Sequence, residues 1–198
     1  MKRIIFATSN EGKMKEIRMI LADKNIEVVS LKEAGITVDI EETGTTFEEN
    51  AIIKAKAIME LTGEIVLSDD SGLEVDYMDK APGVYSARFM GEDTSYDIKN
   101  QYIIDQLKAA KEEERTARFV CVIACAFPSG EIITKRGTIE GVIAHEIVGA
   151  NGFGYDPIFY IPEYGCTTAE LNPEQKNEIS HRGKALKAMK EVLSEVLC

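Results

Sequence analysis

The sequence predicts a mixed α/β fold, and two features of its order carry that prediction. In the first third of the chain, short apolar runs alternate with segments of helical periodicity, which is typical of folds that contain parallel strands. Farther along, two long β-rich runs flank the turn sequence PSG, which predicts an antiparallel hairpin. With 198 residues, of which 44% are hydrophobic, we expect a single domain over residues 1–198.

The first elements alternate between strand and helix. We expect a strand over residues 3–7, the polar turn TSNEGK, and a helix over residues 13–22 whose apolar side chains recur at helical spacing. A short strand over residues 27–30 follows. Thr46 stands three residues before Glu49, and this capping-box pattern predicts the start of a helix that reaches residue 61.

The second half begins at an acidic pair, Asp69 and Asp70, which directly follows an apolar run. We expect one buried strand to end at this pair, where its apolar run stops, and a second strand to continue over LEVDYM. The expected elements from there on are the strands at 64–67 and 73–78, a loop at 80–93, a helix at 95–111, the hairpin strands at 117–127 and 131–144, a glycine-rich loop at 149–159, and a helix at 181–197.

Composition excludes several classes of function. The net charge of −11 opposes binding to a nucleic acid polymer, although clustered cations can still bind a small anion. No apolar run approaches the roughly 18–20 residues that span a bilayer, and the N-terminal apolar run is too short for a signal peptide, so we expect a cytoplasmic protein without membrane contact. The 4 cysteines show no metal-ligand spacing, and we expect buried or incidental thiols.

The turn TSNEGK is a candidate anion site. It lies between a predicted strand and a predicted helix, where backbone N–H groups are unsatisfied and the helix dipole is positive, and Lys13 adds a full charge. The loop is not a Walker A sequence, because Met14 follows the lysine. An ordinary strand–helix connection remains the alternative interpretation.

Four carboxylates are candidates for a magnesium site and a general base. Glu41 and Glu42 precede the second helix, and Asp69 and Asp70 end a predicted strand. If these segments meet, one glutamate and one aspartate can hold Mg²⁺, which prefers carboxylate and phosphate oxygens, and a remaining carboxylate can accept a proton from water. A solvated turn is the alternative for any one of them.

Two later segments have residues suited to a nucleotide. In NGFGYDPIF, glycines flank Phe153, so that Phe153 or Tyr155 can stack on a base, unless both aromatics pack into the core. In KNEISHRGKALK, the basic side chains of Lys176, His181 and Arg182 gather within an acidic protein near a predicted helix start. Positive charge is unfavourable there, which indicates that an anion or a carbonyl-bearing ligand compensates.

These segments together resemble the inosine triphosphate pyrophosphatase family, also called XTP/dITP diphosphatases. The resemblance runs nearly from end to end, through six motifs in the same order: FATSNEGK, EETGTTFEENAIIKA, SDDSGLEVD, APGVYSARF, GFGYDPIF and SHRGKAL. It implies Mg²⁺-dependent hydrolysis of ITP, dITP and XTP to the monophosphate and pyrophosphate. It also implies a homodimer and an elongated mixed sheet flanked by helices, with two lobes around a central substrate cleft.

The resemblance assigns roles to particular residues. Asp70 is expected to act as the base and as a metal ligand, with Glu41 as the second ligand, although the adjacent Glu42 is not excluded. Ser71 is expected to contact substrate. The other residues expected to bind substrate are Thr8, Ser9, Asn10, Glu11, Gly12 and Lys13 around the phosphates, and Phe153, Gly154, Tyr155, Asp156, Lys176, His181 and Arg182 around the base and sugar.

Two other interpretations remain. A Maf-type nucleotide pyrophosphatase would share the architecture but read a different base, and it usually opens with a serine-rich segment that ATSNEGK lacks. A nucleotide sensor would bind without hydrolysis. The segment SDDS argues against a sensor, because a protein that only binds has no need of a positioned base.

Overall fold

A computed structural model describes residues 2–22 and 26–196. Within them, seven strands form one sheet in the order β2-β1-β3-β4-β5-β6-β7. The strands are β1 (Lys2–Phe6), β2 (Ile26–Ser30), β3 (Val66–Val75), β4 (Thr116–Ala126), β5 (Ile132–Ile143), β6 (Phe159–Ile161) and β7 (Cys166–Thr167). Strand β1 pairs in parallel with β2 and β3, whereas β6 pairs antiparallel with β5 and β7. The predicted mixed α/β class is therefore confirmed.

Five α-helices accompany the sheet in the described residues. They are α1 (Glu11–Leu21), α2 (Phe47–Thr62), α3 (Tyr96–Gln106), α4 (Pro173–Ile179) and α5 (His181–Val196). The predicted capping box at Thr46 is present: its side chain accepts from Glu49 N, and the Glu49 carboxylate accepts from Thr46 N. No described helix is long and apolar enough to cross a membrane.

The chain forms two compact units. The first contains residues 1–70, 121–137 and 181–198, and the second contains residues 71–120 and 138–180. Each unit has its own cluster of buried apolar side chains. The prediction of a single domain over residues 1–198 stays a prediction, as does the expected substrate cleft.

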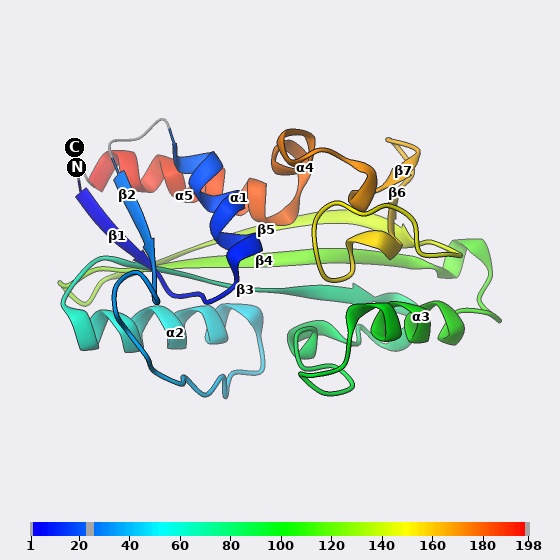
Figure 1. Cartoon of the computed structure of the whole chain (residues 1–198), viewed down its shortest axis with the longest axis horizontal. Helices are drawn as coiled ribbons and strands as arrows, with labels where there is room; N and C mark the ends of the chain where they lie inside the picture. The colour runs from blue at the N-terminus through cyan, green and yellow to red at the C-terminus, as the bar shows by residue number, and fades with distance from the viewer. Residues whose placement is uncertain (1, 23–25, 197–198) are drawn as a thin grey trace. The chain divides into compact units, whose positions relative to one another are not determined.

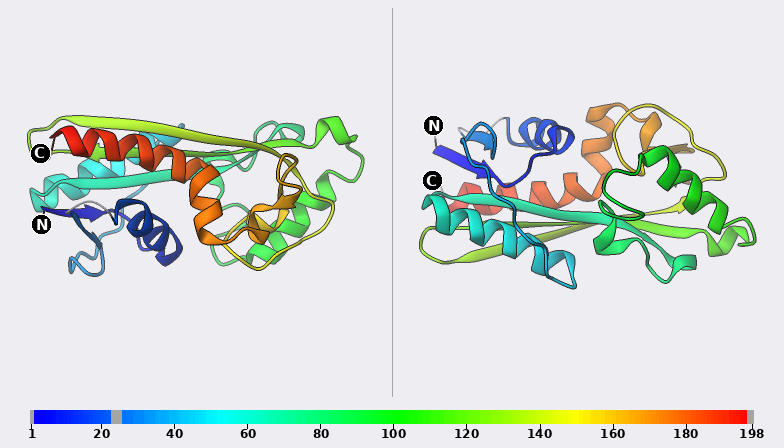
Figure 2. Two further views of the ribbon diagram at one scale, coloured as in Figure 1. Left: turned by 90° about the horizontal axis from the view of Figure 1, so that it is seen from above. Right: turned by 60° about the horizontal axis from the view of Figure 1, so that its bottom comes forward.

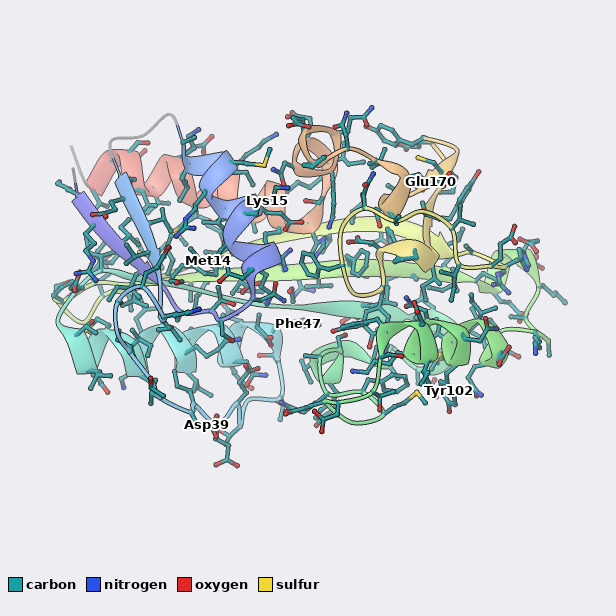
Figure 3. All side chains as sticks on the ribbon, viewed as in Figure 1. Met14, Lys15, Asp39, Phe47, Tyr102 and Glu170 are labelled. Carbon is teal, nitrogen blue, oxygen red and sulfur yellow. The ribbon has the colours of Figure 1, made fainter. Side chains whose placement is uncertain are left out.

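In the first unit, α1 and α5 lie on one face of the strands and α2 lies on the other (Figure 1). Met14 on α1 is buried in the apolar cluster together with Leu186 and Met189 of α5, whereas the neighbouring Lys15 is exposed (Figure 3). On the opposite face, Ser68 on β3 donates a hydrogen bond to the Ala51 carbonyl of α2.

In the second unit, α3 and α4 lie on opposite sides of the strands of that unit (Figures 1 and 2). Ile103, Ile104 and Leu107, in and just after α3, are buried in the apolar cluster of this unit. Tyr102 on the same helix is exposed (Figure 3). These positions follow the helical period, so one face of α3 is buried and the other meets solvent.

The structure corrects several predicted elements. No break falls at the acidic pair: β3 runs unbroken from Val66 to Val75, and both aspartates lie inside the strand. Helix α1 begins at Glu11, two residues earlier than expected, because the Asn10 side chain caps it. Helix α3 ends at Gln106 instead of residue 111. Strands β6 and β7 and helix α4 were not predicted, and the expected end of the last helix, Leu197, lies outside the described residues.

Candidate active site

The turn between β1 and α1 carries the predicted phosphate-binding residues. Asn10 accepts a hydrogen bond from Lys13 N through Oδ1, and its own N–H donates to Thr8 Oγ1. Ser9, Asn10 and Glu11 are exposed, and Gly12 is partly buried. The turn thus presents the start of an 11-residue helix to solvent, where free N–H groups favour an anion, although the Glu11 carboxylate would oppose it.

Asp69 holds two cations in the first unit. Its carboxylate accepts from Lys13 Nζ at 3.0 Å and from Arg182 Nη2 at 3.2 Å. Burial alone would raise the pKa of Asp69, but the charges of Lys13 and Arg182 hold that pKa below its usual value. Asp69 is therefore ionised and fully engaged as the anchor of the two cations.

Asp70, its neighbour in β3, has the opposite electrostatic state. The residue is 6% exposed. Burial raises the pKa of Asp70 to about 6; Lys54 opposes this rise, whereas Glu42 and Asp69 add to it. A carboxylate that exchanges its proton near neutral pH is suited to accept a proton from water.

Lys54 on α2 links Asp70 to the acidic turn. Its Nζ lies 2.9 Å from Glu42 Oε1 and 3.8 Å from Asp70 Oδ1. Burial lowers the pKa of Lys54, but Asp69, Asp70 and Glu42 outweigh burial and leave that pKa raised. Glu41, the metal ligand preferred from the sequence, is exposed in the same turn. The structure thus brings Glu42 toward Asp70 through Lys54.

No group of three or more histidine, cysteine, aspartate or glutamate side chains that could hold a metal occurs in residues 2–22 and 26–196. Two carboxylates, those of Glu42 and Asp70, lie within ion-pair distance of Lys54, and we call this arrangement the two-carboxylate corner. This corner is defined by Glu42, Lys54 and Asp70.

Arg182 is buried at the start of α5. From the sequence, we expect this residue to contact the purine base or sugar of the nucleotide. Arg182 is 2% exposed, and its Nη1 lies 2.6 Å from Glu16 Oε2 on α1. Together with its bond to Asp69, this contact makes Arg182 part of an ion network with Glu16, Asp69 and Lys13. His181 is also buried, at 6% exposure. The structure therefore groups Arg182 with the predicted phosphate-binding lysine.

The position of this helix start depends on Gly137 of β5. A Cβ at Gly137 would lie 2.2 Å from the His181 carbonyl oxygen and 2.7 Å from Ala185 N. Both atoms are backbone, so neither can move aside as a flexible side chain would. The absence of a side chain at Gly137 thus permits α5 to approach the sheet with Arg182 facing the ion network.

In the second unit, Asp156 organises the glycine-rich loop. Its Oδ2 accepts from Phe153 N at 2.8 Å and from Lys176 Nζ at 2.7 Å, and its Oδ1 accepts from Thr168 Oγ1 at 2.8 Å. Gly152 has a φ of +72°, and a Cβ there would lie 2.2 Å from Asp156 Oδ2. Asp156 and Lys176 are both buried, so they serve primarily to hold the loop.

The two aromatic residues of this loop differ. Tyr155 is buried; its hydroxyl donates to the Ser86 carbonyl at 2.6 Å, and its ring meets the edge of Tyr96. Burial raises the pKa of Tyr155, so its hydroxyl stays protonated. Phe153 is partly exposed, and Lys176 Nζ lies 4.7 Å from its ring centroid. Of the two predicted stacking residues, Phe153 is the one still accessible.

Ser71 and Gly154 are the other residues that the sequence predicts to bind substrate. Ser71 is partly buried on β3, and Gly154 is partly exposed with a φ of +67°. The first unit brings together Lys13, Asp69 and Arg182, with Asp70 facing Lys54, and the second brings together Phe153, Asp156 and Lys176.

Three charged or polar residues in these networks were missed from sequence. Glu16 lies one helical turn before the buried Ile20, and Lys54 lies seven residues after the buried Phe47, so both fall on inward helix faces. A charged residue at an apolar face position is the signal that could have found them. Thr168, in a short 3₁₀ turn, has no such signal.

Known proteins are similar to this chain over nearly its whole length. A family model described as the Ham1 family matches residues 4–192. A dITP/XTP pyrophosphatase of Desulforamulus reducens is 51% identical over 194 residues, covering 98% of this chain and 96% of that protein. A dITP/XTP pyrophosphatase of Clostridium perfringens is 47% identical and covers 100% of both chains.

Solved structures give the same result for the fold. The structure of a HAM1 protein from Coxiella burnetii superposes with a TM-score of 0.89 at 44% identity, covering 98% of this chain and 100% of that chain. The Ham1 protein of Staphylococcus aureus gives a TM-score of 0.87 at 41% identity, with 98% and 100% coverage.

Proposed function

This chain belongs to the Ham1 family, and on that premise we propose that it hydrolyses ITP, dITP and XTP to the monophosphate and pyrophosphate. The relatives named dITP/XTP pyrophosphatase match it over nearly their whole length. This reaction would remove nonstandard purine nucleotides from the cytoplasmic pool.

The observation that carries the proposal is the contrast between Asp69 and Asp70. Asp69 pairs with Lys13 and Arg182, whereas the buried Asp70 faces a different cation, Lys54, whose Nζ lies 3.8 Å from Asp70 Oδ1. We assign Asp70 the role of the base that accepts the proton of the attacking water. Lys13, which is part of the turn TSNEGK, is suited to neutralise negative charge that develops on the leaving pyrophosphate.

The donors of the two-carboxylate corner fit Mg²⁺. Glu42 and Asp70 already face one positive charge, the Lys54 ammonium. Mg²⁺ is usually held by one or two carboxylates together with waters and substrate phosphates, so a cage of three side chains is unnecessary. Bound Mg²⁺ would supply charge that offsets the phosphate oxygens. Asp70 would be one ligand, and the second would come from the adjacent glutamates.

Matched variants distinguish those glutamates. Glu41→Gln and Glu42→Gln each remove one charge from the same turn, and Mg²⁺ titration of each purified variant measures the change in affinity. The sequence favours Glu41, whereas the proximity of Glu42 to Lys54 favours Glu42. The ligand is the residue whose loss weakens Mg²⁺ binding by about tenfold or more.

The base would be recognised by Phe153 and the surrounding loop. Hypoxanthine and xanthine carry a 6-keto oxygen where adenine carries an amino group, and N–H donors pair only with the oxygen. A site built around such hydrogen bonds discriminates steeply, because the wrong base leaves buried polar groups unpaired.

The test is a nucleotide panel with the purified chain. ITP, dITP, XTP, ATP and GTP are each incubated with Mg²⁺, with and without EDTA, and the release of pyrophosphate and orthophosphate is followed. We expect pyrophosphate from the nonstandard purines, and none when EDTA is present. Orthophosphate as the first product would overturn the proposal, and tight XTP binding without turnover would indicate a sensor.

A further inference from the structure

Helix α3 of the second unit contacts the glycine-rich loop through Asn100, a residue outside the motifs that the sequence singled out. Asn100 is 1% exposed, and its Nδ2 donates to the Gly154 carbonyl at 3.1 Å. This bond fixes the orientation of the amide, because only the NH₂ group can face a carbonyl oxygen. A Cβ at Gly154 would lie 3.6 Å from the ring of Tyr96, on the same helix.

The contacts on the two sides of Phe153 come from different elements. On its N-terminal side, the Phe153 N–H is held by Asp156. On its C-terminal side, the carbonyl of the next residue, Gly154, is held by Asn100. The Phe153 carbonyl accepts from Asp156 N at 3.3 Å, so Asp156 holds both peptides that flank Phe153, and Asn100 holds the next peptide, between Gly154 and Tyr155. With these three peptides held, the partly exposed Phe153 ring has little freedom left to lose when a ligand binds, and such preorganisation improves affinity.

Stability alone does not account for an asparagine at this position. Its Oδ1 is buried, and it has no hydrogen-bond partner among the residues that the structure describes. An unsatisfied buried acceptor is unfavourable, and an apolar side chain of similar size would avoid that cost. If an apolar side chain replaced Asn100, water could donate to the Gly154 carbonyl instead, because Gly154 is partly exposed. A protein selected only for stability would have little reason to retain the amide.

We propose that Asn100 is a positioning residue that sets the Phe153 loop for the nucleotide base. The proposal rests on the function proposed above and adds a specificity residue to it. Asn100 acts through Gly154, so its loss changes how the base is bound and distinguished while the carboxylates of the first unit keep their surroundings. The neighbouring residue Lys99 is buried, and its Nζ donates to the Ala87 carbonyl at 2.8 Å, which fastens α3 to the segment that contains Ala87.

The test compares Asn100→Leu with Gln101→Leu, an exposed position on the same helix. Amide hydrogen exchange of residues 152–156 reports the loop itself, whether or not the protein is active. Calorimetric titration with XTP and GTP in EDTA reports base recognition without turnover. The rate at saturating XTP and the urea midpoint complete the set, and Asn100→Ala is the second variant if leucine prevents folding.

For Asn100→Leu we expect faster exchange in residues 152–156, roughly tenfold weaker XTP binding and a smaller XTP preference over GTP, because one hydrogen bond is lost. The rate at saturating XTP and the urea midpoint should stay near the unmodified values, and Gln101→Leu should change nothing. Unchanged exchange, or faster exchange with unchanged XTP and GTP affinities, would overturn the proposal. Failure of the unmodified chain to release pyrophosphate would instead count against the proposed function.

Discussion

Asp69 and Asp70 are adjacent in one strand, yet their surroundings give them opposite roles. Side chains alternate across a strand, so the two carboxylates leave β3 on opposite faces. One meets Lys13 and Arg182, and the other faces Lys54. A sequence shows two identical residues here. Only the partners from α1, α2 and α5 distinguish an anchor from a base.

Neutralising the two aspartates should therefore have different effects on stability. Asp69→Asn removes the carboxylate that Lys13 shares with the buried Arg182, which keeps Glu16 as a partner, and should lower the free energy of unfolding by roughly 3 kcal/mol. Asp70→Asn should change it by less than about 1 kcal/mol, because burial already disfavours the charged form of Asp70. Urea unfolding at neutral pH measures both. Equal destabilisation by the two substitutions would contradict the assignment.

Asp76 in the second unit gives a stability contribution that depends on pH. The Asp76 carboxylate accepts hydrogen bonds from Arg118 and Thr116. These bonds, of which the one from Arg118 has the larger effect, lower the pKa of Asp76 from 3.8 to about 2. A carboxyl with a lowered pKa in the folded state stabilises above its unfolded pKa, and this stabilisation disappears as pH falls toward the folded value.

The stability difference between the unmodified chain and Asp76→Asn should disappear as the pH falls from about 4 to about 2. Asp76→Asn should cost on the order of 1 kcal/mol at pH 7, because the ion pair is partly exposed, and almost nothing near pH 2. Urea midpoints across this range measure the difference, with the exposed Asp93→Asn as control. A difference that stays constant with pH would show that charge is not the cause.

At the scale of elements, the sequence predicted the helices and strands whose own residues carry the signal. Helix α2 has its capping box and its buried Ala51 and Ala55, and both β4 and β5 are long β-rich runs. Strand β3 was predicted as two strands because the acidic pair interrupts its apolar run, but pairing with neighbouring strands outweighs that local preference. Helix α4 and strand β7 are too short for periodicity to show.

Gly137→Ala tests how the sheet positions α5. The new Cβ would meet backbone atoms of His181 and Ala185, so the helix start must shift away from β5. We expect a loss of about 1–3 kcal/mol in the free energy of unfolding and a fall in XTP turnover, because Arg182 moves with the helix. Arg136→Ala, at the exposed neighbouring position, is the control. Normal stability and turnover in Gly137→Ala would show that the close approach is unimportant.

At the scale of the whole molecule, the net charge of −11 makes local cation clusters the relevant feature for an anionic substrate. Asp69 draws Lys13 and Arg182 together within an acidic protein, so two cationic side chains lie near the turn TSNEGK, where Asp69 and Glu16 balance their charge. Composition predicted the exclusion of nucleic acid polymers, but the grouping of cations depends on contacts between distant segments.

The expected homodimer is a separate prediction at this scale. The chain has a mass of 21.9 kDa, so multi-angle light scattering should give about twice that mass. A mass of one chain at micromolar concentration would refute the dimer and leave the assignment of Asp70 untouched. The prediction depends on family resemblance and not on any contact within the chain.

The most direct test of the account is the rate of pyrophosphate release from XTP by Asp70→Asn, measured beside the unmodified chain with Mg²⁺ at neutral pH. The variant should unfold at nearly the same urea concentration and release pyrophosphate at least about a hundredfold more slowly, because general-base catalysis contributes that much or more. A folded variant that retains the unmodified rate would contradict the account.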